Sequence, residues 1–327
     1  MSKPIIVSGI KPSGDLHIGN YLGSIKQFID WQNKADCYFF IADYHSLTEN
    51  YDPKLKAKQT LEVAGMYLAA GLDPNKCVLF VQSDVPSHTE LSWIFNCVTP
   101  VSFLERMTQY KDKTKKDPTN RNMGLFDYPV LQAADILMYK AIAVPVGQDQ
   151  VQHVELTRDI AKLFNKRFGQ TFPEPKAIIT EVAKVMSLLD PNKKMSKSYG
   201  QGYVINLLDD EKTVIKKLSK AVTDTATSGK MSAGVANLFL LLKHFGEQKT
   251  YDSLIKEYTN GTIKYSVLKQ ELAGSINRFL KPLQERYQRY AKDPKALRKV
   301  LDQGKEKAGA VARETMMEVR EKIGLLN

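Results

Sequence analysis

Two short segments of the sequence combine glycine, histidine, lysine and serine residues at spacings that suit phosphate chemistry. In residues 8–23, glycines recur around His17, directly after the apolar run 5–7 and before a helical pattern. A glycine-rich turn at a helix N-terminus exposes backbone N–H groups to an anionic ligand. In residues 193–198, three lysines and two serines are clustered, as a clamp on transferring phosphates would require. Each segment by itself also fits a plainer interpretation: the glycine segment could be an ordinary turn, and the lysine segment could be a solvated basic face.

The composition is that of a globular protein with an excess of basic residues. The chain has 327 residues, of which 43% are hydrophobic and 25% charged, and its net charge of +11 favours a polyanionic partner. Cys37, Cys77 and Cys97 are too few and too far apart for a disulfide framework or a zinc knuckle, so we expect reduced thiols and no metal site. No apolar run approaches the roughly 20 residues that span a bilayer. We therefore expect a cytoplasmic protein that does not insert into membranes.

Apolar runs alternate with amphipathic helical patterns through the first half of the chain. One such helix is bounded by an N-cap at Asp52 and by Gly71. The alternation predicts an α/β fold with a doubly wound, Rossmann-like parallel sheet. Ligands of such sheets bind beyond the carboxyl ends of the strands, where the glycine turn 9–14 and the polar residues 43–45 lie. The expected strands include 5–7, 37–42, 77–81 and 144–146.

A single carboxylate interrupts an otherwise apolar helix expected over residues 128–139. Asp135 lies among leucine, isoleucine, alanine and methionine, so it should be buried and should need a hydrogen-bond donor. Two sources of that donor are open: a neighbouring helix, as in a structural ion pair, or a bound ligand. Because alanine would continue the apolar surface, we expect the fold to survive Asp135→Ala. The strand 144–146 and the turn 147–150 form a second place where backbone can meet a ligand.

The pattern changes near residue 200 to long amphipathic helices. An apolar stripe recurs at helical spacing from Leu297 to Val319, with lysine and arginine on the remaining face. From Lys281 onward, basic residues outnumber acidic ones. We expect a catalytic domain over residues 1–200 and a helical C-terminal domain over residues 201–327.

Taken together, the two segments resemble the signatures of a known family. Residues 17–20, His-Ile-Gly-Asn, resemble the HIGH signature of class I aminoacyl-tRNA synthetases, and residues 194–198 match their KMSKS signature letter for letter. The resemblance covers nearly the whole chain and is strongest to bacterial tryptophanyl-tRNA synthetases. It implies a class I nucleotide-binding catalytic domain, a helical anticodon-recognising domain and a homodimer. Further matching residues are 8–10, 12–14, 43, 45, 105–109, 128–129, 133–137, 144–147, 149–150 and 186–188.

The resemblance also implies roles for individual residues, none of them as ligand of a protein-bound metal. The catalytic residues it implies are His17, Lys113, Lys194 and Lys197. The ATP-binding residues it implies are Lys11, Pro12, Ser13, Gly19, Asn20, Gly147, Gln148, Asp149, Val185, Lys194, Met195, Ser196, Lys197 and Ser198. The tryptophan-binding residues it implies are His45, Tyr128, Gln132, Asp135, Val144, Val146 and Gln150, with the indole N–H on Asp135. The sequence departs from many members at Lys11, Gln148 and Gln132, where they have glutamine, glutamate and methionine.

The reaction implied is activation of L-tryptophan by ATP, with Mg²⁺, followed by transfer of tryptophan to tRNA(Trp). Tyrosyl-tRNA synthetases are the nearest alternative, but an acceptor-only carboxylate at position 135 suits an indole N–H, which cannot accept. A nucleotidyltransferase with the same signatures and no tRNA is a second alternative, and the basic helical domain disfavours it. A tRNA-binding paralogue without catalysis is a third, and the two intact signatures disfavour it.

Overall fold

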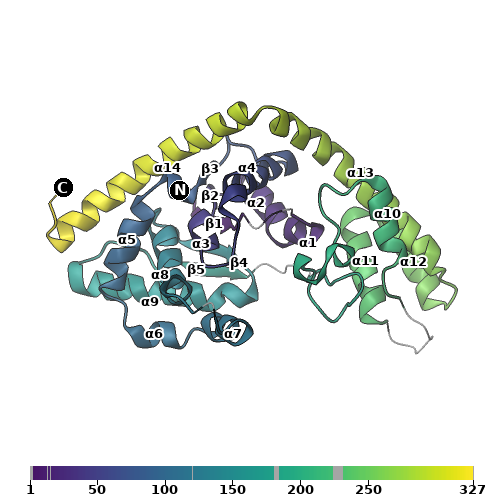
Figure 1. Ribbon diagram of the computed structural model, residues 1–327, viewed down its shortest axis with the longest axis horizontal. Coiled ribbons are helices and arrows are strands. Elements are labelled where there is room, and N and C mark those ends of the chain that lie inside the picture. Colours follow the sequence, from purple (N-terminus) through teal and green to yellow (C-terminus); the bar gives the residue numbers. More distant parts are fainter. Residues whose placement is uncertain are drawn as a thin grey trace. The chain divides into compact units, whose positions relative to one another are not determined.

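The computed structural model describes residues 3–12, 14, 16–119, 121–179, 184–223 and 231–326, apart from the side chains of Lys113 and Lys116. The chain forms two compact units, each built from separate stretches of sequence (Figure 1). The sheet unit comprises Met1–Gly14, Phe28–Glu181 and Asp293–Asn327, and the helical unit comprises Asp15–Gln27 and Val182–Lys292. None of the described helices is long and apolar enough to cross a membrane.

Five parallel strands form the centre of the sheet unit in the order β3-β2-β1-β4-β5. The central pairing aligns Ile5 of β1 with Asp36 of β2, and β1 also pairs with β4. The strand order reverses between β1 and β4, which is the switch point where doubly wound sheets bind ligands. The predicted Rossmann-like parallel sheet is therefore confirmed. The strands are β1 (Ile5–Ile10), β2 (Asp36–Ile41), β3 (Val78–Val81), β4 (Ala143–Val146) and β5 (Lys176–Ile179).

Helices cover both faces of this sheet. Successive side chains of β2 point to opposite faces: Phe39 stacks on Phe28, with ring centroids 4.4 Å apart, while the ring of Phe40 lies 6.0 Å from that of His88, and both partners belong to helices. This coverage explains why the strands are apolar runs rather than alternating patterns. The helices are α2 (Lys26–Trp31), α3 (Asp43–Ser46), α4 (Pro53–Ala70), α5 (Ser87–Asn96), α6 (Val101–Glu105), α7 (Thr108–Lys116), α8 (Met123–Leu137), α9 (Val151–Phe168) and α14 (Pro294–Ile323).

The helix boundaries follow local capping chemistry. The helix α4 has the expected caps: Asp52 accepts a hydrogen bond from the Lys54 N–H, and Gly71 adopts a left-handed conformation with φ of 118°. In contrast, α8 begins at Met123, five residues before the expected start at 128, because the Asn122 side chain caps its N-terminus. Its apolar character continues through an internal proline, Pro129.

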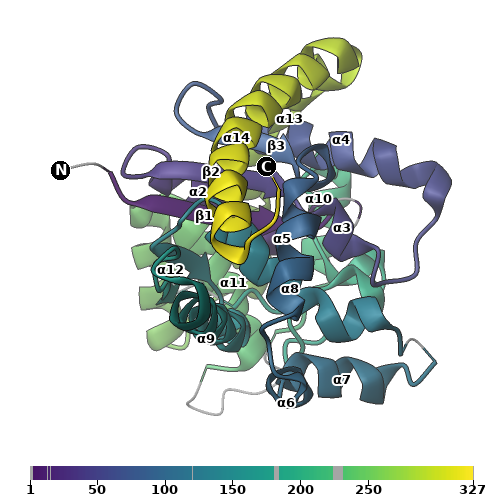
Figure 2. The same ribbon diagram turned by 90° about the vertical axis from the view of Figure 1, so that its left-hand side faces the viewer.

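The last helix, α14, returns to the sheet unit and packs against β3 (Figure 2). The closest approach is at Gly304, where an added Cβ would overlap the carbonyl oxygen of Leu79 and lie 2.6 Å from its carbonyl carbon. Thr315 on the same helix donates a hydrogen bond to the backbone of Met138, and Arg320 pairs with Glu90 on α5. The helix therefore covers β3, an edge strand of the sheet.

We expect Gly304→Ala to destabilise the protein by about 1–3 kcal/mol, because its methyl group would meet backbone atoms that cannot move aside. Gly309→Ala on the same helix is the matched control. A Cβ at Gly309 would first meet the guanidinium end of Arg313 at 3.4 Å, so this variant should be neutral or slightly stabilised by the higher helix propensity of alanine. Urea unfolding of both variants measures the difference, and equal stabilities would contradict the packing.

The helical unit contains most of the chain after residue 182 together with Asp15–Gln27. The boundary expected near residue 200 differs from this division, since α14 contacts the sheet and residues 15–27 pair with residues 205–207. Local composition could not show this, because both departures are contacts between residues distant in sequence. The elements of the helical unit are α1 (Ile18–Asn20), the π-helix η1 (Tyr21–Ile25), the 3₁₀-helices η4 (Lys197–Tyr199) and η5 (Gln201–Tyr203), α10 (Glu211–Ser219), α11 (Ala233–Phe245), α12 (Gln248–Thr259) and α13 (Tyr265–Lys292).

Candidate active site

The structure brings the two sequence signatures together within the helical unit. The backbone N–H of Ile18 donates to the Ile205 carbonyl at 2.9 Å, and the N–H of Leu207 donates to the Leu16 carbonyl at 2.8 Å. These bonds attach the His-Ile-Gly-Asn segment to the chain that follows the lysine loop. A Cβ on Gly19 would lie 3.6 Å from the Cβ of Met195, so glycine permits this close approach.

His17 caps the helix that begins at Ile18. Its Nδ1 accepts a hydrogen bond from the Asn20 N–H, and the Asn20 side chain accepts in return from the His17 N–H. Burial and the neighbouring charges of Lys197 and Lys194 lower the pKa of His17 to about 4. The imidazole is therefore neutral at physiological pH, and with Nδ1 accepting, its proton is on Nε2. A neutral donor beside two lysines is suited to a phosphate oxygen.

The lysine loop, residues 193–198, is anchored at Met195 and is exposed on either side of it, at Lys194 and Ser198. Met195 is buried, and its N–H donates to the Val185 carbonyl at 2.9 Å. Ser196 caps the short helix η4 by accepting from the Ser198 N–H, and the two hydroxyl oxygens lie 2.9 Å apart. Lys194 is exposed. The loop thus presents cations and hydroxyls on a fixed base.

Other residues predicted to bind ATP lie in the sheet unit. Lys11 pairs with Glu49, the Nζ to Oε1 distance being 2.9 Å, and Pro12 beside it is buried. The position of Ser13 falls outside the described residues, and Lys113 lies on α7 with its side chain outside them.

The turn after β4 begins at Gly147 and continues into the 3₁₀-helix η3 (Gln148–Gln150). A Cβ on Gly147 would lie 2.8 Å from Oδ1 of Asp149, so glycine makes room for this carboxylate. The Gln150 amide donates to the other oxygen of Asp149 at 2.9 Å. The turn lies at the switch point of the sheet.

Asp135 on α8 is buried, with 1% of its surface exposed, and both of its oxygens accept hydrogen bonds from side chains. The Gln82 Nε2 donates to both oxygens at 2.8 and 2.9 Å, His45 Nε2 to Oδ2 at 2.7 Å, and His88 Nδ1 to Oδ1 at 2.6 Å. The other ring nitrogen of His88, Nε2, forms a hydrogen bond with the Tyr139 hydroxyl at 2.8 Å. Burial opposes ionisation of Asp135, but the bonds from His45 and His88 outweigh it and hold its pKa below the usual value.

This network corrects one expectation from the sequence. Asp135→Ala would leave the donors of Gln82, His45 and His88 without their common acceptor in a buried place, at about 1–3 kcal/mol for each unsatisfied group. The substitution is therefore expected to destabilise the fold rather than to leave it intact. Asparagine, which keeps the volume and one acceptor oxygen, is the better probe of the carboxylate.

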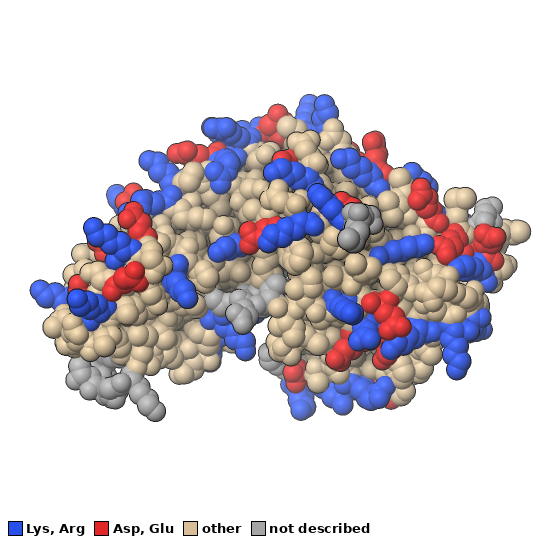
Figure 3. Space-filling view, turned by 180° about the vertical axis from the view of Figure 1, so that it is seen from behind, with Lys and Arg blue, Asp and Glu red and all other residues tan. Residues whose placement is uncertain are grey.

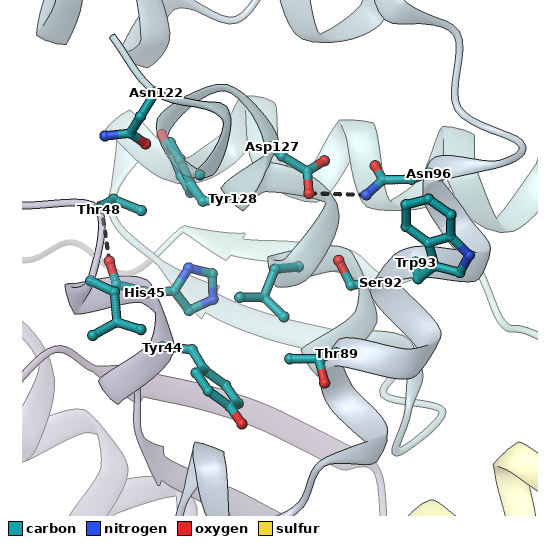
Figure 4. A pocket seen from close by; sticks show the side chains of 13 residues that line it. Tyr44, His45, Thr48, Thr89, Ser92, Trp93, Asn96, Asn122, Asp127 and Tyr128 are labelled. Atoms are coloured by element: carbon teal, nitrogen blue, oxygen red, sulfur yellow. Dashed lines mark hydrogen bonds between the residues drawn. The ribbon is translucent and has the colours of Figure 1, made fainter. Parts of the chain in front are cut away.

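A pocket of about 420 Å³ opens beside this network (Figure 4). His45 and Tyr128 line it, and the Tyr128 hydroxyl is 2.9 Å from Nε2 of the buried His153. Other predicted tryptophan-binding residues are not among those that line it: Asp135 is reached through His45, while Val144 and Val146 are buried on β4 and Gln132 is partly buried on α8. The lining residues are Tyr44, His45, Leu47, Thr48, Thr89, Ser92, Trp93, Asn96, Asn122, Gly124, Asp127, Tyr128 and Leu131.

The sequence matches the model of the family described as tRNA synthetases class I (W and Y) over residues 1–281. The chain belongs to this family. Among its relatives, the tryptophan–tRNA ligase of Caldanaerobacter subterraneus is 46% identical over 98% of both chains. Tryptophan–tRNA ligase 2 of Streptomyces avermitilis is 45% identical over 99% of this chain and 98% of the relative.

Solved structures of the family agree in fold with this synthetase. The tryptophanyl-tRNA synthetase from Campylobacter jejuni, complexed with ADP and tryptophan, is 40% identical with a TM-score of 0.87, covering 98% of this chain and 100% of that one. The enzyme from Mycoplasma pneumoniae is 33% identical with a TM-score of 0.86, covering 99% of this chain and 98% of the other.

Three residues in the hydrogen-bond network of Asp135 were not predicted from the sequence of this synthetase, namely Gln82, His88 and Tyr139. Gln82 directly follows β3, so a polar side chain at the carboxyl end of a strand was a usable signal. His88 lies in the first turn of α5, and Tyr139 lies just after α8. Neither has a local feature that points to Asp135.

Proposed function

We propose that the chain is a tryptophan–tRNA ligase. It activates L-tryptophan with ATP to tryptophanyl-AMP and pyrophosphate, and then transfers tryptophan to the 3′ end of tRNA(Trp), with AMP as the leaving group. The observation that carries this proposal is the approach of His17 and Gly19 to the lysine loop, because it gathers phosphate-binding groups on one rigid base. The substrate follows from relatives 45–46% identical over almost the entire chain, which are tryptophan–tRNA ligases.

The first step needs charge neutralisation more than proton transfer. The tryptophan carboxylate attacks the α-phosphorus of ATP already ionised, so no general base is required, and pyrophosphate leaves with the bond electrons. Catalysis then depends on in-line placement of two anions and on stabilising the charge spread over the phosphates. Lys194, Lys197 and Lys113 would supply the positive charge, and the Nε2–H of His17 a neutral hydrogen bond. Mg²⁺ would enter as the counter-ion of the ATP phosphates.

Recognition of the two substrates is divided between several elements. The Gly147–Gln150 turn with Lys11, Pro12 and Ser13 would bind the nucleotide, together with Asn20, Val185 and the lysine loop. Tryptophan would be placed by Tyr128, Gln132, Val144, Val146 and Gln150, with its indole N–H on Asp135. His45 is the donor to Asp135 that also lines the pocket, so it is the partner that an indole N–H would displace.

The helical region after residue 200 is proposed to bind tRNA(Trp) and to read its anticodon. Figure 3 shows that Lys and Arg side chains are spread over one face of the whole protein and interspersed with Asp and Glu. Contact with tRNA would therefore be made through many separate cations rather than through one uniform patch. We further propose a cytoplasmic homodimer. Its interface would use exposed apolar side chains of the sheet unit such as Trp93 and Met123, which are 71% and 74% exposed.

Binding of tRNA should be strongly salt-dependent, because it releases counterions from the phosphates. Between 50 and 200 mM salt the affinity should fall at least about 10-fold. Replacing the exposed Lys281 and Arg289 of α13 by glutamine should reduce the slope by about one for each lost phosphate contact. Pyrophosphate exchange without tRNA in the same buffers is the control and should change little. A salt-independent affinity, or exchange activity without any charging of tRNA, would favour the tRNA-independent nucleotidyltransferase instead.

A further inference from the structure

An asparagine on α11 is bonded to the backbone next to the lysine loop. Asn237 is 4% exposed, its Oδ1 accepts from the Met186 N–H at 2.8 Å, and its Nδ2 donates to the Met186 carbonyl at 2.9 Å. One side-chain amide therefore satisfies both backbone groups of a single residue, as a neighbouring strand would.

Met186 in turn pairs with the start of the lysine loop. Met186 and Lys194 form an antiparallel bridge, flanked by hydrogen bonds from the Ser187 N–H to the Lys193 carbonyl and from the Met195 N–H to the Val185 carbonyl, both at 2.9 Å. In this arrangement the N–H and C=O of Met186 point away from Lys194. The Asn237 amide lies on the side to which they point. It therefore holds the hairpin formed by residues 185–195 from the side opposite Lys194.

The helix that carries Asn237 is itself fixed to this hairpin. At its N-terminus a Cβ on Gly234 would overlap the Val222 carbonyl oxygen, and the N–H of Val222 donates to the Leu188 carbonyl at 2.9 Å. Asn237 lies among buried apolar residues of α11, including Leu238 and Leu241. Asparagine is a weaker helix former than alanine, and a buried polar group is costly unless it is bonded, so its two bonds to Met186 explain its presence.

We propose that Asn237 is a positioning residue for adenylate formation: it holds the hairpin so that Lys194 and Lys197 meet the phosphates of ATP. The proposal rests on the function proposed above for the lysine loop. Because Asn237 is buried and bonded to Met186, it would act through Met186 and the bridge to Lys194 rather than by contact with a substrate. A loop displaced by about 1 Å can lower the rate of a reaction about 100-fold, because stabilisation of the transition state depends on placement.

The test is steady-state pyrophosphate exchange with full-length Asn237→Ala, at a temperature well below its unfolding transition. We expect kcat to fall about 10- to 100-fold and the KM for ATP to rise, with the KM for tryptophan unchanged, since among the described residues the Asn237 side chain bonds Met186, which pairs with the lysine loop. Asn237→Asp is the second variant. It keeps the acceptor for the Met186 N–H but sets a negative oxygen against the Met186 carbonyl, so we expect the same pattern with a comparable loss.

Asn165→Ala is the matched control. Asn165 makes a similar set of backbone bonds within the sheet unit: its Oδ1 accepts from the N–H groups of Thr171 and Phe172 at 2.9 and 3.0 Å, and its Nδ2 donates to the Phe172 carbonyl at 2.8 Å. This variant should lose stability but keep the kinetics of the wild type. Normal kinetics in both Asn237 variants, or an equal loss of kcat in Asn165→Ala, would show that the bonds of Asn237 to Met186 are merely structural and would overturn the proposal.

Limited trypsin digestion separates this proposal from the function on which it rests. Cleavage after Lys194 and Lys197 of the folded protein should be faster in Asn237→Ala than in the wild type or in Asn165→Ala. If the wild type shows no tryptophan-dependent exchange, the proposed function is refuted. If the wild type is active but Asn237→Ala is cleaved no faster than the wild type, only the positioning role of Asn237 is refuted.

Discussion

Alanine in place of Lys197 is expected to slow adenylate formation about 100-fold or more and to leave tryptophan binding almost unchanged. Lys197 opens η4, beside the neutral His17 whose pKa it helps to lower. Its charge meets negative charge that develops on the phosphates during the reaction, so its removal should raise the energy of the transition state more than that of the bound substrates. Single-turnover formation of the adenylate, with the Kd of tryptophan measured separately, resolves the two effects.

Lys193→Ala is the control for this prediction. Lys193 belongs to the same cluster, but its Nζ pairs with Asp190 at 2.9 Å and its side chain is half exposed. Its removal should change the rate by less than the loss of Lys197 does, because a paired surface charge contributes little. Equal rate losses in the two variants, or a parallel loss of tryptophan affinity in Lys197→Ala, would mean that the loop acts through structure or general charge.

We also expect Asp135 to have a large effect on kcat/KM, measured as the preference for tryptophan over an analogue whose ring lacks the N–H. The wild type should use the analogue at least about 10-fold less well, because a buried carboxylate would lose a charge-assisted bond worth about 1.5–3 kcal/mol. Asp135→Asn should weaken the use of tryptophan by a similar factor and should reduce the preference over the analogue. The comparison uses kcat/KM from pyrophosphate exchange.

Asparagine at 135 keeps one of the two acceptor oxygens, so Gln82 and one of the two histidines keep their bond, and the protein should lose less stability than in Asp135→Ala, which thermal unfolding checks. His88→Asn keeps a donor near Oδ1 of Asp135 and serves as the control for disturbance of the network. If the wild type treats tryptophan and the analogue alike, Asp135 serves only to hold α5 and α8 together and the proposed contact with the indole is wrong.

Features that depend on neighbouring residues were predictable from the sequence. The caps of α4 follow from Asp52 and Gly71, and the parallel sheet follows from apolar strands that alternate with helices. The burial of Asp135 follows from the apolar residues around it. In each case the physical cause lies within one turn of helix or one strand, so the local pattern carries it.

Features that depend on contacts between distant segments were not predictable in this way. Two of the three side-chain donors to Asp135 come from positions 82 and 88, about fifty residues earlier in the chain, and the pairing of Lys11 with Glu49 joins two separate turns. The return of α14 to β3 is visible in sequence only as an amphipathic stripe with a glycine at 304. An amphipathic stripe shows that a helix packs against the rest of the protein, but it does not show which element the helix contacts.

Whether the protein activates tryptophan is measured most simply by ATP–pyrophosphate exchange with the full-length protein, screened with each of the twenty amino acids in turn. We expect exchange that depends on tryptophan, with tyrosine at least about 100-fold less effective, because an acceptor-only carboxylate matches the donor-only indole N–H, whereas the hydroxyl of tyrosine also needs a donor for its oxygen. Exchange supported best by tyrosine, or by a substrate that is not an amino acid, would show that the protein is not a tryptophan–tRNA ligase.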